Sequence, residues 1–172
     1  MGIDSAYTST KQIPRTFKKF QDYFGNIESN LDFGGGKYEL ATNWLEQQGA
    51  KNYVYDPFNR SKDHNESVMD HVIEQGVDCI TCLNVLNVIQ DKNERIGVLS
   101  MIRCVAEDCK RVRAYPTIFI QVYEGNKTGE PSRTTAQMNR RATDYYDEIR
   151  YLFNEEDWLM FRYGNIYEVS HV

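Results

Sequence analysis

The stretch that decides the fold is Leu31-Asp32-Phe33-Gly34-Gly35-Gly36-Lys37-Tyr38. A short strand, predicted over 30–33, runs directly into three glycines, and a helix is predicted to follow over 38–48. Glycines at such a junction let the backbone approach a ligand closely, and the start of the next helix offers free N–H groups. The turn predicts a ligand site at the end of the first strand. The other interpretation is a packing turn without a ligand.

Helix and strand signals alternate along the chain, which indicates an α/β, Rossmann-like, doubly wound fold with a mostly parallel sheet and a C-terminal antiparallel hairpin. The segment between Asp56 and Val77 is short for two helices and a strand, so the sheet is expected to have one strand fewer than usual. Residues 124–134 are expected to form a mobile loop. Helices are predicted over 15–24, 38–48, 65–75, 93–108 and 135–153, and strands over 30–33, 51–56, within 77–89, 116–123, 158–163 and 166–169.

Length and composition indicate one globular domain over residues 1–172, with 1–29 as an N-terminal helical extension. The net charge of −5 gives no electrostatic basis for tight, non-specific nucleic-acid binding. Basic side chains near residues 11–19 and 133–141 are interpreted as solvated faces, with a basic patch as the alternative. No apolar run approaches the roughly 20 residues that cross a bilayer. The protein is expected to be cytoplasmic, without membrane contact.

The cysteines do not predict a metal site. Cys79 and Cys82 have the spacing of a redox or zinc pair. They fall in a predicted central strand, whose geometry points residues three apart to opposite faces. Buried thiols are therefore favoured over a redox or zinc site. The three histidines do not cluster in the sequence, and no metal is expected.

Two acidic residues flank the glycine turn. Asp56 ends the second predicted strand, where a carboxylate can accept hydrogen bonds from ribose hydroxyls. Asp32 precedes the glycines, where a carboxylate can balance an ammonium group. This pair favours S-adenosylmethionine (SAM), which is cationic at its amine and sulfonium, over a dinucleotide, whose pyrophosphate Asp32 would repel. The dinucleotide fingerprint is also broken at Glu39. A nicotinamide-dependent enzyme is the least favoured interpretation.

The same motifs resemble those of class I SAM-dependent methyltransferases. The stretch 31–38 is similar to their first motif, acidic-x-Gly-x-Gly-x-Gly, and departs from it at Tyr38, where the third glycine would stand. Asp56 matches the family's ribose-binding acidic residue, and 78–89 is similar to the fourth-strand motif, whose residues line the methyl-transfer site. Several short segments, including Leu86-Asn87-Val88-Ile89, resemble segments in a compact phage and bacterial group and in methyltransferase-like proteins associated with DNA phosphorothioation. The resemblance specifies fold and cofactor but not substrate.

Candidate site residues follow from these patterns. Asn84 and Asn87 are expected at a strand's carboxyl edge, to orient substrate or cofactor, and neither can act as a base; strand-end capping is the alternative role. Tyr123 and Glu124 are expected at the same edge, with Glu124 as the most plausible base. Tyr123 could instead be a partly buried aromatic. The expected cofactor-binding residues are Asp32, Phe33, Gly34, Gly35, Gly36, Tyr38, Asp56, Pro57, Phe58, Asn84 and Val85.

The leading hypothesis is a SAM-dependent methyltransferase. The Asn/Asp-Pro-Pro-aromatic signature of nucleobase amino-methyltransferases is absent, and Asn84-Val85-Leu86-Asn87 stands in its place. Direct DNA binding is therefore not favoured, and the acceptor is expected to be a small molecule, RNA or protein. The alternative is a non-catalytic SAM-fold module that acts through a protein partner in a phage or defence system. The missing third glycine motivates this alternative.

Overall fold

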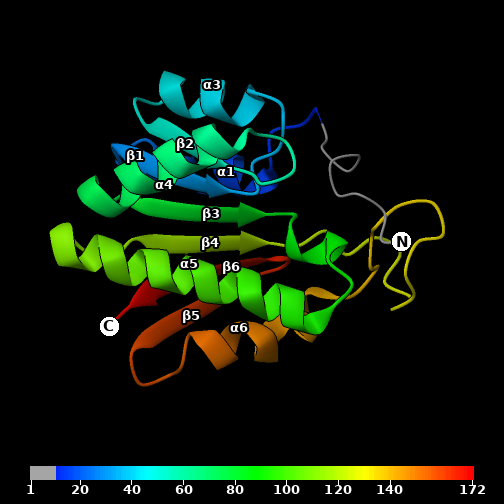
Figure 1. Cartoon of the computed structure of the whole chain (residues 1–172). Coiled ribbons are helices and arrows are strands. Elements are labelled where there is room, and N and C mark those ends of the chain that lie inside the picture. Colours follow the sequence, from blue (N-terminus) through cyan, green and yellow to red (C-terminus); the bar gives the residue numbers. More distant parts are fainter. Residues whose placement is uncertain (1–10) are drawn as a thin grey trace.

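A six-stranded sheet in the order β2-β1-β3-β4-β6-β5 forms the centre of the computed structural model, which describes residues 11–172 (Figure 1). Strands β1 to β4 run parallel, and β6 is antiparallel to both β4 and β5. This confirms the doubly wound fold with its C-terminal antiparallel hairpin. The strands are β1 Ser29–Phe33, β2 Lys51–Tyr55, β3 Cys79–Leu83, β4 Thr117–Gln121, β5 Trp158–Tyr163 and β6 Ile166–His171.

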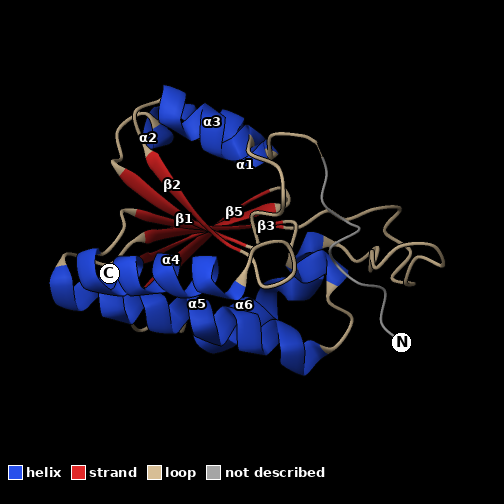
Figure 2. Ribbon diagram, turned by 45° about the horizontal axis from the view of Figure 1, so that its top comes forward, coloured by secondary structure: helices blue, strands red, loops and turns tan. Residues whose placement is uncertain are grey.

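Helices cover both faces of the sheet (Figure 2). One face carries α1 Arg15–Lys19, α2 Gln21–Phe24 and α3 Leu40–Gln47; the other carries α4 Lys62–Gln75, α5 Lys92–Val112 and α6 Tyr146–Leu152. Two short 3₁₀ helices, η2 Leu86–Val88 and η3 Ala142–Tyr145, complete the fold.

The two sheet faces bury separate apolar clusters. Cys79 belongs to the cluster beneath α1–α3 and Cys82 to the cluster beneath α4–α6. Both thiols are fully buried, and burial raises the pKa of each. The structure thus places the two cysteines on opposite faces, as the strand geometry predicts, and they serve as packing groups.

The region after β2 contains a helix and no strand. Only α4 lies between Tyr55 and Cys79, which leaves β2 at the edge of the sheet. The expectation of one strand fewer is therefore confirmed. Helix α4 begins at Lys62 rather than at Asn65, because the Ser61 side chain accepts a hydrogen bond from the His64 backbone N–H at 3.2 Å and caps the helix.

Other helix predictions also differ in extent from the structure, and α5 continues to Val112, beyond the predicted end at 108. The helix predicted over 135–153 occupies only 142–152, because the segment before it is held as an irregular loop: Met138 N–H donates to the Asn87 carbonyl, and Asn139 adopts φ +53°. The helix predicted over 15–24 is broken at Phe20, whose ψ is 36°. Of the predicted extension over 1–29, residues 1–10 lie outside the described residues, and Ser29 already belongs to β1.

A buried ion pair joins α5 to α6. Arg95 donates from Nε and Nη2 to the two carboxylate oxygens of Glu148, at 2.7 Å each, and from Nη1 to the Ile89 and Gln90 carbonyls. Burial alone would raise the pKa of Glu148, but the hydrogen bonds and charges of Arg95 and Arg140 outweigh it and hold the pKa below its usual value. The pair fixes the segment after β3 against the C-terminal half of the chain.

Removing one partner of this pair should destabilise the fold. In Glu148→Ala, Arg95 becomes a buried charge without its carboxylate, so the free energy of unfolding in urea should fall by about 3–5 kcal/mol. Because the folded pKa of Glu148 is lowered, its contribution is present at neutral pH and is lost as the pH falls through the folded pKa. Exposed Glu156→Ala is the control, and a loss below about 1 kcal/mol in Glu148→Ala would contradict the assignment.

Candidate active site

The candidate site lies where the sheet changes direction. The chain passes from β1 outward to β2 and then returns to β3 on the other side of β1, which makes the carboxyl ends of β1 and β3 a switch point. Two adjoining pockets open there, with volumes of about 90 Å³ and about 1070 Å³. Gln12, Pro14 and Asn84 line both pockets, so they form a common wall.

The smaller pocket lies over the glycine turn. Gly34 and Gly36 adopt φ +81° and +76°, a conformation that strains any residue with a side chain. A Cβ on Gly34 would lie 2.5 Å from Cγ2 of Val85, and a Cβ on Gly35 would lie 2.7 Å from Oδ2 of Asp32. The glycines therefore allow Val85, in the segment after β3, to approach the turn, and they leave the Asp32 carboxylate without a side chain over it at the pocket floor.

Asp32 is the buried acid of this pocket. Its side chain is 4% exposed, and burial raises its pKa to about 6. The Thr81 hydroxyl donates to Oδ1 at 3.1 Å, while the Asn30 amide donates to both Thr81 and Asn52 beneath it. This layer of polar side chains positions the carboxylate. Asp32 is thus half-charged near pH 6 and available to a cationic ligand group above that pH.

Asp56 has a different role in this structure. Its carboxylate accepts from the backbone N–H of Gly36 at 2.8 Å, of Phe58 at 2.9 Å and of Asn59 at 3.0 Å, and from the Asn59 amide at 3.1 Å. A carboxylate has about four acceptor positions, so the protein itself occupies them. Asn65 holds the Asp56 backbone through bonds to its N–H and carbonyl. Asp56 therefore ties the glycine turn to the end of β2.

The remaining cofactor candidates separate into two groups. Tyr38 lines the smaller pocket, and Val85 contacts the glycine turn. Phe33 lies in the core and packs against the Tyr55 ring, with a centroid distance of 4.8 Å and an interplanar angle of 33°. Pro57 and Phe58 are exposed, Phe58 by 65%, and line neither pocket. The structure therefore brings together Asp32, the glycines, Tyr38, Val85 and Asn84, but not 57–58.

Asn84 lies between the pockets in a constrained conformation. It adopts φ +62°, its N–H donates to the Gln121 carbonyl at 2.7 Å, and its side-chain oxygen accepts from the Gln121 amide at 2.9 Å. The Gln121 side-chain oxygen in turn accepts from the N–H and hydroxyl of Thr16. Gln121 therefore connects the start of helix α1 to Asn84. A glutamine that ends an otherwise apolar strand was the sequence signal for this residue, which the sequence prediction missed.

Asn87 and Tyr123 lie farther along the larger cavity. The Asn87 amide donates to Gln137 at 2.8 Å, and its oxygen accepts from the Tyr123 N–H at 3.1 Å. Asn87 thereby fastens the loop after β4 to the segment after β3. Tyr123 is 60% exposed and lines the cavity.

Glu124 does not line either pocket. Its carboxylate accepts from the Ala142 N–H at 2.8 Å and pairs with Lys127 at 3.1 Å. The Ala142 hydrogen bond, followed by Lys127, lowers its pKa, which makes it a weaker base.

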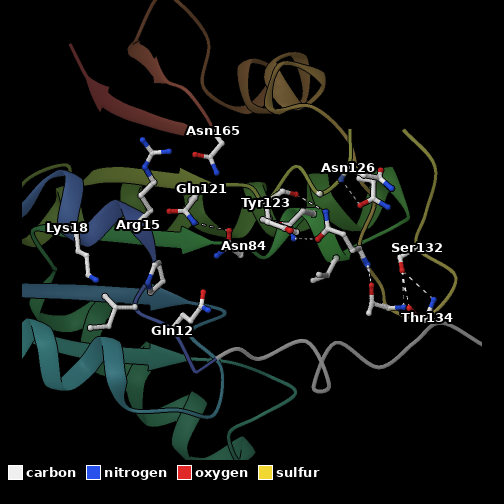
Figure 3. A pocket seen from close by; sticks show the side chains of 18 residues that line it. Gln12, Arg15, Lys18, Asn84, Gln121, Tyr123, Asn126, Ser132, Thr134 and Asn165 are labelled. Atoms are coloured by element: carbon white, nitrogen blue, oxygen red, sulfur yellow. Dashed lines mark hydrogen bonds between the residues drawn. The ribbon is translucent and has the colours of Figure 1, made fainter. Parts of the chain in front are cut away.

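The N-terminal segment supplies cavity residues that no motif indicated, although two of them, Arg15 and Lys18, belong to the basic group near residues 11–19. Gln12, Arg15 and Lys18 lie along one side of the larger cavity, opposite the loop that carries Ser132 and Thr134 (Figure 3). Asn165, from the β5–β6 turn, completes the wall near Gln121. Their sequence neighbours carry no ligand-binding motif, so only the folding of α1 over the sheet edge brings them here.

Within residues 11–172, no group of three His, Cys, Asp or Glu side chains is arranged to hold a metal ion. Over the same residues, none of the helices combines the length and the apolar character that spanning a membrane requires.

Comparison with known proteins identifies the fold. No family model matches the sequence, and no curated protein matches it. Among solved structures, 1,6-didemethyltoxoflavin-N1-methyltransferase from Burkholderia thailandensis, with bound 1,6-didemethyltoxoflavin and S-adenosylhomocysteine, is 15% identical with a TM-score of 0.59, over 95% of this chain and 78% of that one. A SAM-dependent methyltransferase from Archaeoglobus fulgidus is 11% identical with a TM-score of 0.52, over 90% of both chains.

The SAM-dependent methyltransferase SibL is 13% identical with a TM-score of 0.52; the match covers 91% of this chain and 53% of SibL, so the chain spans about half of that protein. The chain therefore has the Rossmann-like fold of class I SAM-dependent methyltransferases.

The Gly34–Val85 contact can be tested against a matched glycine. Gly34→Ala and Gly49→Ala both place a side chain at positive φ, +81° and +94°, but only position 34 has a neighbour, since nothing lies within 4 Å of a Cβ on Gly49. Each variant should lose about 1 kcal/mol from backbone strain, and Gly34→Ala should lose a further 1–3 kcal/mol or so from overpacking. Urea unfolding measures both, and equal losses would contradict the close contact.

The Asn87 clamp on the loop can be tested by hydrogen exchange. In Asn87→Ala the Tyr123 N–H loses its acceptor, so its exchange should accelerate about tenfold, and the segment 124–141 should exchange faster as well. Asn126→Ala is the control, because the Asn126 amide oxygen bonds only within the loop, to Thr128. Unchanged exchange at Tyr123 in Asn87→Ala would exclude the clamp.

Proposed function

We propose that the chain is a SAM-dependent methyltransferase that uses the smaller pocket for the methionine end of SAM and the larger cavity for the acceptor. The observation that carries the proposal is the Asp32 carboxylate, buried beneath a side-chain-free glycine turn and 4% exposed, next to a cavity of about 1070 Å³. Asn84 stands in the wall between the two spaces. This is the arrangement that a transfer between two bound molecules requires.

The residues fit the methionine end of SAM. A Cβ on Gly35 would fall on the Asp32 carboxylate, so its absence leaves that oxygen open to an ammonium group. The fit at the ribose end depends on Asn59. Because its side-chain amide occupies one acceptor position of Asp56 at 3.1 Å, a ribose hydroxyl gains that position only when this amide moves. Asp56 thus holds the turn closed and becomes a ribose ligand by exchange.

When bound, SAM supplies a methyl group on a positively charged sulfur, a good leaving group. The chain's own residues then position the acceptor: Asn84 stands between the two pockets, and Asn87 and Gln121 hold the cavity wall in place through their bonds to Gln137, Tyr123 and Thr16. Among the described residues, no Asp or Glu lines the larger cavity. The acceptor atom must therefore attack with a lone pair that needs no strong base, or lose its proton to water.

The alternative function is a non-catalytic SAM-fold module that acts through a protein partner. The filled acceptor positions of Asp56 and the engagement of Glu124 with Ala142 favour it. For either function, we also propose that the protein is cytoplasmic and that it is related to the compact phage and bacterial group that its sequence resembles. Labelled methyl transfer from SAM into a cell extract would exclude this alternative; SAM binding without transfer, together with a stably co-purifying protein, would favour it.

Binding of S-adenosylhomocysteine, measured by isothermal titration, tests the role of Asp32. Asp32→Asn keeps the shape but removes the charge, so the Kd should rise about 10- to 100-fold at pH 8. Because the pKa of Asp32 is about 6, the native affinity should fall as the pH drops below 6, up to about tenfold per pH unit. The affinity of Asp32→Asn for S-adenosylhomocysteine should change less with pH between pH 5 and pH 7.

Asp70→Asn, an exposed carboxylate on α4, is the control for loss of one negative charge. Absence of binding by the native chain at high micromolar ligand would refute the proposed function. Equal affinity of Asp32→Asn and Asp70→Asn would refute the role of Asp32 alone.

A further inference from the structure

The wall of the larger cavity is rich in carboxamides and poor in acids. Eight of its 18 lining residues are Asn or Gln, two are basic, and none is Asp or Glu. A protein with a net charge of −5 therefore presents a cavity of the opposite sign. The carboxamides are Gln12, Asn84, Asn87, Gln121, Asn126, Gln137, Asn139 and Asn165.

The two cations lie together at one end. Arg15 and Lys18 are three residues apart on α1, a spacing that places side chains on the same face of a helix. Both are exposed, and within residues 11–172 neither has a carboxylate within salt-bridge distance. Figure 3 shows them on the side of the cavity formed by α1. They are suited to an anionic group on a ligand.

One carboxamide in this wall has a buried oxygen without a partner. The Asn165 amide donates to the Val122 carbonyl at 2.7 Å, which fixes the orientation of its side chain and turns Oδ1 the other way. Oδ1 is buried and has no hydrogen-bond partner among the described residues. A buried acceptor of this kind costs about 1–3 kcal/mol unless a donor reaches it. A ligand N–H that displaces the atoms covering Oδ1 would provide that donor.

The opposite part of the cavity offers an aromatic ring. Tyr123 is 60% exposed at the cavity wall although its backbone is held at both ends, its N–H by Asn87 and its carbonyl by the Gln137 amide at 2.7 Å. A fixed backbone with an exposed ring makes a stacking platform for a flat ligand. Asn and Gln are among the side chains that hydrogen-bond to nucleobase edges, to adenine above all.

We propose that the acceptor is a nucleoside phosphate: its phosphate lies against Arg15 and Lys18, and its base lies among the carboxamides near Tyr123 and Asn165. The inference rests on the proposed function for its reaction, but the binding site stands on the cavity itself. A volume of about 1070 Å³ accommodates a nucleotide, since pockets for small ligands occupy roughly 300–1,000 Å³.

The chemistry is consistent with a cavity that has no acidic lining residue in the described chain. A ring nitrogen of the base attacks with its lone pair and forms the N–CH₃ bond. The C–S bond breaks, and its electron pair passes to sulfur, which becomes a neutral thioether. The positive charge moves to the base, which keeps it or releases an N–H proton to water. No strong base is needed.

The experiment is equilibrium binding of the four nucleoside 5′-monophosphates and their four nucleosides to the full chain, with and without S-adenosylhomocysteine. At least one monophosphate should bind at least tenfold more tightly than its own nucleoside. Arg15→Gln/Lys18→Gln should abolish that difference while the Kd for S-adenosylhomocysteine stays within twofold. The charge-matched control, Lys62→Gln/Lys92→Gln on the other sheet face, should still bind the monophosphate more tightly than the nucleoside.

The base-binding half is tested separately with Asn165→Ala, which should weaken the nucleoside and the monophosphate equally, by about fivefold or more. A single-stranded ten-nucleotide RNA forms a further arm. If the RNA binds more tightly than the monophosphate and also loses affinity in Arg15→Gln/Lys18→Gln, the natural ligand is a nucleotide within an RNA strand. If the RNA binds more weakly than the monophosphate, the natural ligand is a free nucleoside phosphate.

Two results would overturn the proposal: no monophosphate binds to a chain that binds S-adenosylhomocysteine, or nucleoside and monophosphate bind equally. Failure of S-adenosylhomocysteine to bind refutes the proposed function instead. Because nucleotide binding is also measured without it, the two failures are distinguishable.

Discussion

The structure depends on one close approach, that of Val85 to the glycine turn. A Cβ on Gly34 would meet the Val85 side chain at 2.5 Å, so β1 and the segment after β3 can meet only where no side chain stands. This contact lies at the point where the sheet changes direction, and Gly34 itself lines the smaller pocket. Positive φ at Gly34 adds a second reason why no other residue is suited to the position.

Two carboxylates next to that turn have separate roles, decided by their partners. Asp32 has one hydroxyl donor, from Thr81, and lies at a pocket floor, so burial dominates and its pKa rises to about 6. Asp56 is equally buried but accepts four hydrogen bonds from Gly36, Phe58 and Asn59, which makes it a structural tie. A ligand donor at Asp32 finds carboxylate acceptor positions that no protein group fills. A ligand donor at Asp56 must displace the Asn59 side-chain amide.

The larger cavity is built by segments far apart in the sequence. Gln121 at the end of β4 bonds both Thr16 at the start of α1 and Asn84 after β3, so one glutamine fixes the helix that carries the cations and the residue that faces both pockets. Asn87 likewise fixes the loop after β4, because its side chain bonds to Gln137 and to the Tyr123 N–H. The larger cavity is therefore a consequence of side-chain hydrogen bonds between loops, rather than of any one motif.

The sequence by itself determined the alternation of elements, the shortened segment after Asp56, the glycine turn with Asp32, and the opposite faces of Cys79 and Cys82, because these follow from local periodicity, glycine and chain length. Only the tertiary structure decided that Phe58 is exposed, that Glu124 binds the Ala142 N–H, and that residues 135–141 are not helical. Long-range hydrogen bonds set the last two features, from the Ala142 N–H to Glu124 and from the Met138 N–H to the Asn87 carbonyl. Their partners lie many residues away, and such pairings leave no periodic trace in the sequence.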